Sequence, residues 1–151
     1  MIELIISIGT LSAVIYLFIL LYLITGIMRY KIEITNKQPF VSIIVAAHNE
    51  SQNIKICLNS LLNQDYPQDR MEIIIVDDRS EDNTALILKE YEAKNALIRV
   101  ISISECEPGL SPKKNALSKA VVNAIGEIIA VTDADCKTPS QWLKKGVSYF
   151  T

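Results

Sequence analysis

Two aspartates separated by one residue are the most concentrated group of potential ligands in this sequence. Asp133 and Asp135 follow the apolar run 128–131, which has the composition of a strand. Hard divalent cations prefer oxygen ligands, and Mg²⁺ is commonly held by one or two carboxylates together with substrate phosphates. Aspartates are also frequent in ordinary turns, because the side chain bonds to the nearby backbone. The pair therefore indicates a metal that holds a diphosphate only if further residues gather beside it.

Polar residues follow two other predicted strands in the same way. The run 41–47 leads into residues 48–50, His-Asn-Glu, and the run 72–76 leads into residues 77–80, Asp-Asp-Arg-Ser. Each cluster could instead cap a helix or close a turn, since Asn, Asp and Ser do both. Several carboxylates on one rim repel one another unless a cation or a hydrogen-bonding ligand lies among them. Their shared placement favours a binding site.

Positive charges that complement the acidic clusters lie at the start of the helix predicted over 112–124. Lys113 and Lys114 occupy its first turn, where free amide groups and the helix dipole favour an anion. A diphosphate could bridge the metal and a lysine. The alternative is a solvated basic turn, and this alternative is stronger for Lys114 than for Lys113.

The elements that must position these residues alternate along the chain. Near-continuous apolar strands between amphipathic helices indicate an α/β fold with a mostly parallel sheet covered on both faces. Ligands of such sheets bind at the carboxyl ends of the strands, so the three acidic clusters are expected at one edge. Polar residues 80–83 are expected to start the second helix. The expected strands are 41–47, 72–76, 97–102 and 127–131, and the expected helices are 51–64, 80–94, 112–124 and 139–151.

The first 30 residues form a different kind of segment. The segment from Leu4 to Met28 carries no charged side chain. It is long enough to form a helix of roughly 37 Å. A signal peptide would begin with basic residues, a core helix is seldom apolar all round for this length, and an interfacial helix would show a strongly polar face. We therefore expect one transmembrane helix over 1–30, followed by a linker over 31–40.

The charges beside this helix predict its orientation. Arg29, Lys31 and Lys37 follow it, whereas Glu3 is the charged residue before it. Basic residues concentrate on the cytoplasmic side of membrane helices. The sequence thus predicts a single-pass protein of the cell membrane with a cytoplasmic soluble domain.

Composition narrows the function classes. A formal net charge of −2 gives no basic footprint for nucleic acid, and a single histidine leaves little room for a histidine-based metal site. Cys57, Cys106 and Cys136 are widely spaced and match no metal-ligand pattern, as expected of reduced cytosolic thiols.

Four motifs, in this order, resemble the inverting family 2 glycosyltransferases with a GT-A fold. They cover nearly all of the soluble part, and each alone would be a weak signal. The motifs are VSIIVAAHNE at 41–50, VDDRSEDNT at 76–84, KKNAL at 113–117 and TDAD at 132–135.

This resemblance implies a nucleotide-sugar donor, most commonly with uridine as its nucleoside. Ala46, Ala47 and Glu50 match positions that line the nucleoside pocket, with Glu50 near the ribose. Asp78 matches the residue that contacts the base. His48 stands where the family often has Tyr or Phe, which leaves stacking on the base available.

The resemblance also assigns the diphosphate end of the site. Lys113 is implied to lie near the nucleotide. Asp133 and Asp135 match the Asp-x-Asp motif, which implies donor binding and Mn²⁺ or Mg²⁺ as cofactor, with Asp135 the direct ligand. Pro112 stands where the family usually has Gly, a change that could alter the loop over the diphosphate.

Family members place their catalytic base and acceptor-binding elements after the Asp-x-Asp strand, and no residue up to Thr151 can be matched to that base. The domain over 41–151 is therefore expected to be the donor-binding half of a GT-A fold, incomplete at its C-terminus. The last helix, 139–151, is expected to pack through Trp142, Leu143 and Val147. The sheet would keep an unpaired edge, which predicts a tendency to associate.

We expect a membrane-anchored inverting glycosyltransferase that transfers a sugar to a lipid-linked or polysaccharide acceptor. One alternative is a fragment that binds nucleotide-sugar and metal without turnover. Another is a receiver-like or other nucleotide-binding α/β domain. The latter is disfavoured because paired aspartates recur at two strand ends together with the lysine turn.

Overall fold

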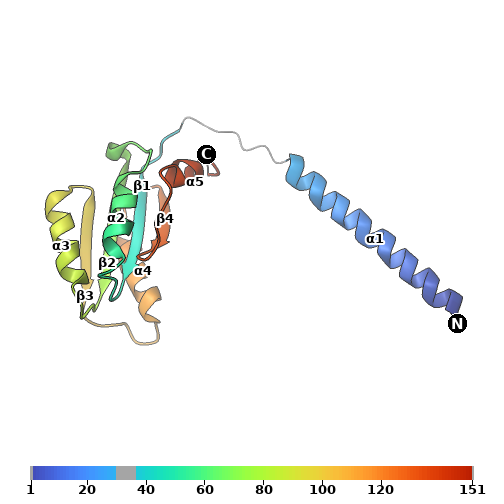
Figure 1. Ribbon diagram of the computed structural model, residues 1–151, viewed down its shortest axis with the longest axis horizontal. Helices are drawn as coiled ribbons and strands as arrows, with labels where there is room; N and C mark the ends of the chain where they lie inside the picture. The colour runs from blue at the N-terminus through green and yellow to red at the C-terminus, as the bar shows by residue number, and fades with distance from the viewer. Residues whose placement is uncertain (1, 30–36, 151) are drawn as a thin grey trace. The chain divides into compact units, whose positions relative to one another are not determined.

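The computed structural model describes residues 2–29 and 37–150 (Figure 1). The chain divides into two compact units, residues 1–33 and 34–151. The expected linker over 31–40 falls largely on residues 30–36, outside the described residues.

Helix α1, Ile2–Arg29, makes up the first unit. Its segment Ile6–Arg29 is long and apolar enough to cross a membrane, judged by length and composition. The hydroxyl groups along it donate to backbone carbonyls three or four residues earlier, at 2.8–2.9 Å, and therefore do not need water as a partner. These hydroxyl groups belong to Ser7, Thr10, Ser12 and Thr25.

The second unit is built on a parallel sheet of four strands in the order β3-β2-β1-β4. The parallel α/β architecture predicted from the sequence is confirmed. In the register of the sheet, Ala46 of β1 pairs with both Val76 of β2 and Asp133 of β4. The strands are β1 Val41–Ala47, β2 Met71–Asp78, β3 Ile98–Ile103 and β4 Ile128–Asp133.

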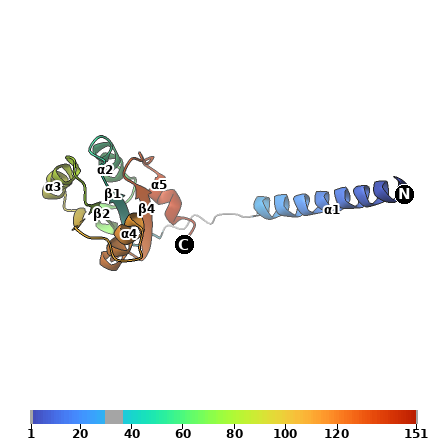
Figure 2. The same cartoon turned by 90° about the horizontal axis from the view of Figure 1, so that it is seen from below.

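Helices lie on both faces of this sheet (Figure 2). One hydrophobic cluster joins alternate residues of β1 and β2 to α2, α3 and α5, and a smaller one joins the other residues to α4. Ile43 and Ile44 of β1, which point to opposite faces, are both fully buried, so the two central strands read as continuous apolar runs. The helices are α2 Ile54–Leu62, α3 Thr84–Lys94, α4 Pro112–Asn123 and α5 Trp142–Val147, with a short 3-10 helix at Gln68–Arg70.

The outer strand β4 departs from the expectation that the sheet is covered on both faces. Its residues alternate in burial, and Ile129 and Val131 are 40% and 48% exposed. The reason is the position of α4, which packs against β2 and β1. One face of β4 is therefore left without a covering helix in the described residues.

Helices α2 and α3 begin three and four residues later than expected, because the segments ahead of them are hydrogen-bonded to one another. The loop after β1 and the loop after β2 are joined by hydrogen bonds of 2.8–3.0 Å. These run from Asn49 N to Ser80 Oγ, from Glu50 N to Thr84 Oγ1, from Ser51 N to Asp82 Oδ2 and from Glu81 N to Asn49 Oδ1. Neither helix has a side-chain cap.

The last helix is also shorter than the expected 139–151. Gln64 of the segment after α2 binds the start of α5, donating to the Pro139 carbonyl and accepting from the Leu143 amide. Leu143 and Val147 are buried and Trp142 packs against the same cluster, as the sequence predicted.

Gly126, between α4 and β4, is predicted to tolerate no side chain. A Cβ there would lie 2.4 Å from the Ser42 amide nitrogen and 2.7 Å from the Ser42 hydroxyl oxygen. Gly126→Ala should therefore lower the free energy of unfolding by about 1–3 kcal/mol, measured by urea titration in detergent micelles with the fluorescence of the single tryptophan, Trp142.

Gly146→Ala in α5 is the matched control, since a Cβ at Gly146 meets nothing within 4 Å. It should leave the stability unchanged or raise it by up to about 1 kcal/mol, because Ala favours helix more than Gly does. Equal unfolding midpoints for the two variants would contradict the close approach at Gly126.

Candidate functional site

A cavity of about 370 Å³ opens at the carboxyl ends of β1, β2 and β4. The strand order turns back between β1 and β4, and this switch point is where parallel α/β sheets bind ligands. The seven residues that the sequence singled out all line this cavity. They are Ala46, Ala47, Glu50, Asp78, Lys113, Asp133 and Asp135, and the lining is completed by His48, Arg79, Pro112, Ala116 and Ala134.

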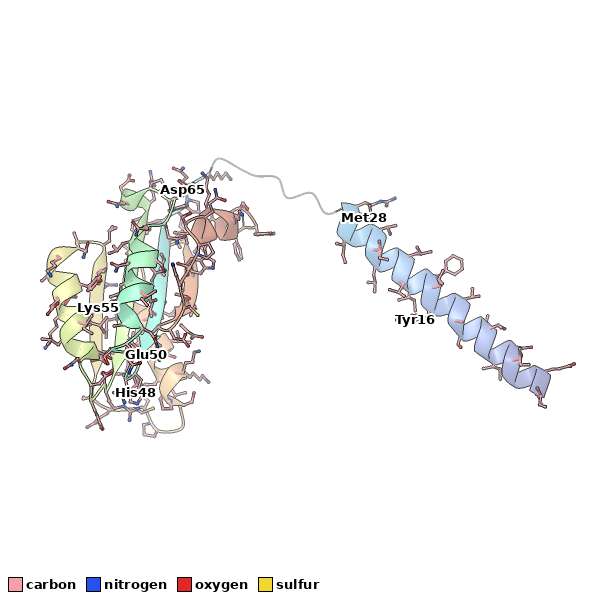
Figure 3. All side chains as sticks on the ribbon, in the orientation of Figure 1. Tyr16, Met28, His48, Glu50, Lys55 and Asp65 are labelled. Carbon is pink, nitrogen blue, oxygen red and sulfur yellow. The ribbon has the colours of Figure 1, made fainter. Side chains whose placement is uncertain are left out.

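On the β1 side, the cavity is lined by two small apolar residues, followed along the chain by polar ones. Ala46 and Ala47 end the strand, and their methyl groups leave room for a flat ligand. One carboxylate oxygen of Glu50 accepts a hydrogen bond from Asn53 Nδ2 at 2.9 Å, which orients the group. His48 and Glu50 lie at the end of the domain opposite to Asp65 (Figure 3).

The β2 side carries an ion pair between a buried carboxylate and an exposed guanidinium. Asp78 has a side chain only 6% exposed, and Arg79 binds it through Nε at 2.8 Å and Nη2 at 3.4 Å. This bond to Asp78 raises the pKa of the Arg79 guanidinium above its usual value. The backbone oxygen of Asp78 accepts from His48 Nδ1 at 2.6 Å, so that β1 and β2 are also joined at this end.

Arg79 was not among the site residues suggested by the sequence. Its backbone is left-handed, with φ of 56°, which turns the chain sharply after β2. The available signal was its position directly after an aspartate at a strand end. By contrast, Asp77 does not line the cavity and accepts from the Ser80 amide, which is the turn role expected as the alternative to binding.

The α4 side supplies a cation. Ser111 caps the helix by accepting from the Lys114 amide, and Pro112 occupies its first turn. Lys113 then reaches Asp133, with 2.6 Å between Nζ and Oδ1. This hydrogen bond raises the pKa of Lys113 above its usual value, so the ammonium stays charged.

The β4 side groups three potential metal ligands. One ligand atom from each of Asp133, Asp135 and Cys136 lies within 4.8 Å of the others, and all three residues are exposed. A tight turn sets this spacing, because the Cys136 amide donates to the Asp133 carbonyl at 3.2 Å. Two carboxylates at a cavity that also offers a lysine form a donor set that fits Mg²⁺ or Mn²⁺.

A buried thiol of α2 is hydrogen-bonded to the same turn. Cys57 of α2 donates from Sγ to the Asp133 carbonyl at 3.6 Å. Burial raises the pKa of this thiol to about 11, which keeps it protonated at neutral pH. Cys57 therefore acts as a packing residue.

The fold and the cavity define a parallel α/β domain with an acidic site at its switch point. Residues 42–151 match the family described as Glycosyl transferase family 2, and the chain belongs to this family. A receiver-like domain is thereby excluded.

Curated relatives carry names from several branches of sugar transfer. Glycosyltransferase AglE of Haloferax volcanii is 32% identical over 114 residues, which are 76% of this chain and 36% of that protein. Beta-monoglucosyldiacylglycerol synthase of Nostoc sp. is 38% identical over 122 residues, 81% of this chain and 26% of that protein. The chain thus spans about a quarter to a third of the length of such relatives.

Solved structures include relatives with bound donors. Mannosyltransferase PcManGT from Pyrobaculum calidifontis, in complex with GDP-Man and Mn²⁺, superposes with a TM-score of 0.71 at 28% identity, over 82% of this chain and 36% of that chain. S. aureus TarS in complex with UDP-GlcNAc gives a TM-score of 0.61 at 29% identity, over 72% of this chain and 30% of that one. Both superpositions extend over most of the present chain.

Asp82 joins the two loops beside the cavity, and its contribution to stability should depend on pH. Hydrogen bonds from Thr84 and from the Ser51 amide hold the pKa of its carboxyl well below the usual range. The stabilisation is therefore complete above the unfolded-state pKa and is lost as pH falls, from about pH 4 downward. Asp82→Asn should be less stable than the parent chain at pH 7, by a gap that narrows toward pH 3.

Urea unfolding midpoints across this pH range measure the gap. Asp69→Asn, which removes a carboxylate from the exposed 3-10 helix, controls for the loss of one charge. A gap for Asp82→Asn that stays constant from pH 7 to pH 3 would show that the carboxylate form does not hold the loops.

Proposed function

We propose that this chain provides the donor-binding part of an inverting glycosyltransferase that uses a nucleotide-sugar. The observation that carries the proposal is the convergence of acidic, basic and small residues from four motifs on one cavity at the switch point. We further propose the division into a membrane helix over 1–30, a linker over 31–40 and a donor-binding domain over 41–151.

In this proposal the nucleoside lies along β1 and β2. The methyl groups of Ala46 and Ala47 allow close approach of the base, and Asp78, held by Arg79, contacts its edge. Glu50, oriented by Asn53, accepts from a ribose hydroxyl. We propose UDP as the carrier of the sugar, and the UDP-GlcNAc complex of TarS supports this choice.

The diphosphate lies between α4 and β4. Lys113 donates to it from the first turn of α4, where the helix dipole adds to the attraction. Asp135 is the direct ligand of Mn²⁺ or Mg²⁺ and Asp133 assists. The cation, when bound, stabilises charge on the departing nucleoside diphosphate. The PcManGT complex with Mn²⁺ supports this assignment, and we assign no catalytic base among residues 37–150.

We propose that α1 anchors the protein in the cell membrane with the donor domain in the cytoplasm. The basic residues after the helix support this orientation. A membrane anchor fits a lipid-linked or polysaccharide acceptor. The names of relatives, which include beta-monoglucosyldiacylglycerol synthase and poly(ribitol-phosphate) beta-glucosyltransferase, support these acceptor classes.

Donor binding is tested by calorimetric titration of UDP into the chain in detergent micelles with Mn²⁺ present. We expect saturable binding that Asp135→Ala weakens at least about tenfold, since loss of even an indirect metal contact costs about 10–100-fold. Asp69→Ala removes an exposed carboxylate outside the cavity and should bind UDP like the parent chain.

Folded protein that binds neither UDP nor GDP would contradict the proposal. Binding that survives Asp135→Ala would remove the metal role of this residue. Binding without sugar transfer to membrane lipids or polysaccharide would favour the alternative of a module that holds donor and metal without turnover.

The orientation is tested with reporters fused after Thr151 and expressed in bacteria. We expect a fluorescent protein to be fluorescent and alkaline phosphatase to be inactive there, because the fusion point lies in the cytoplasm. An active phosphatase and a dark fluorescent protein would reverse the proposed orientation.

A further inference from the structure

We propose that Lys113 is an exchangeable cation of this site. Lys113 pairs with the Asp133 carboxylate when no diphosphate is bound, and it binds the diphosphate when one is present. The diphosphate and the divalent cation therefore bind cooperatively. This inference deepens the proposed function and depends on it.

The contact that carries the inference joins the first turn of α4 to the last residue of β4. Lys113 Nζ lies 2.6 Å from Asp133 Oδ1, and the side chains are 62% and 55% exposed. The ammonium is thus placed on a carboxylate that the Asp-x-Asp motif assigns to donor and metal binding. Asp135 and Cys136 lie on the same turn.

The two partners differ in how freely they can move. The Asp133 carbonyl is bound by Cys57 Sγ at 3.6 Å and by the Cys136 amide at 3.2 Å. In addition, the backbone of Asp133 pairs with Ala46 in the sheet. Lys113 has a long, exposed side chain with several rotatable bonds. A change of partner therefore moves the lysine side chain and leaves the backbone of Asp133 in place.

A divalent cation and the lysine compete for this carboxylate. Mn²⁺ or Mg²⁺ binds a carboxylate oxygen at about 2.1 Å, which would place it beside the ammonium on Oδ1. Like charges at such a distance repel one another. A cation arriving alone must displace Lys113 or bind next to it, and its affinity is lowered in either case.

A diphosphate removes this competition. It offers Lys113 several charged oxygens, and it lies at a helix N-terminus that already favours an anion. Once Lys113 binds the diphosphate, Asp133 is free for the cation. The coupling acts in both directions, because each ligand must raise the affinity of the other by the same factor. It adds to any direct contact between the cation and the phosphates.

The test compares Lys113→Gln with the parent chain in detergent micelles, by calorimetric titration of Mn²⁺ alone and of UDP at saturating Mn²⁺. Mn²⁺ alone should bind Lys113→Gln about three- to tenfold more tightly than it binds the parent chain. A gain of this size is expected when an exposed ion pair no longer competes for the carboxylate and the repulsion from the ammonium is removed. UDP should bind the same variant more weakly. One substitution thus moves the two affinities in opposite directions.

Two further variants control for charge and for shape. Lys114→Gln removes a like charge from the same turn, and Lys114 forms no ion pair within the described part of the chain. It should change the affinity for Mn²⁺ less than about twofold. Lys113→Arg keeps a cation opposite Asp133 and should bind Mn²⁺ alone like the parent chain. Trp142 fluorescence confirms that each variant is folded.

The outcomes separate this inference from the proposed function. If Lys113→Gln weakens UDP binding but binds Mn²⁺ alone no more tightly than Lys114→Gln does, the exchange is overturned and the donor site stands. If folded parent chain binds Mn²⁺ neither alone nor with UDP, the metal site fails, and the exchange fails with it.

Discussion

β1 is hydrogen-bonded along both of its edges, to β2 on one side and to β4 on the other, and the candidate site depends on this double pairing. The register sets Ala46 beside both Val76 and Asp133, so three strands end at the same level. The fully buried Ile43 and Ile44 hold the central strand between two layers of helices. Burial of this kind is the largest favourable contribution to folding, and here it also positions the residues at the strand ends, some of which, such as Asp133, are themselves exposed.

The acidic rim created by these strand ends is balanced by two cations of different character. Arg79 follows Asp78 directly and binds its nearly buried carboxylate with two nitrogen atoms, while the Arg79 side chain is itself 40% exposed. Lys113 reaches Asp133 from another element through an exposed contact. The first pair is suited to a fixed wall of the proposed nucleoside pocket, because breaking it would leave the buried carboxylate of Asp78 unpaired. The second pair is exposed and can exchange partners at little cost, which suits the proposed binding of a diphosphate at this end of the site.

The sequence was sufficient to predict the parallel α/β sheet, the extent of the first strand and the gathering of seven candidate residues at one edge. The sheet and the strand follow from hydrophobic patterns, and the edge at which the acidic clusters lie follows from the rule that ligands bind at the carboxyl ends of parallel strands. The particular set of seven residues, which includes Ala46 and Ala47, came from the resemblance to family 2 glycosyltransferases. The predicted starts of α2 and α3 were wrong, because Asn49, Ser80 and Asp82 have side chains that suit a helix cap and a loop contact equally well. Only the three-dimensional approach of the two loops decides between these uses.

The exposure of one face of β4 was not predicted for a similar reason. The sequence of β4 does not indicate that α4 packs over β2 and β1. Arg79 was missed because its role depends on a left-handed backbone.

Residues from β1, β2, α4 and β4 must form one metal-dependent donor site if the proposed function is correct. Nuclear magnetic resonance of the isotope-labelled chain in micelles, with UDP and substoichiometric Mn²⁺, tests this requirement, because Mn²⁺ broadens the signals of nearby amides. We predict broadening centred on residues 133–136 that extends to residues 46–50, 78–79 and 112–116, and that disappears in Asp135→Ala. Broadening centred on another part of a folded domain, or unchanged by this substitution, would contradict a donor site at the switch point.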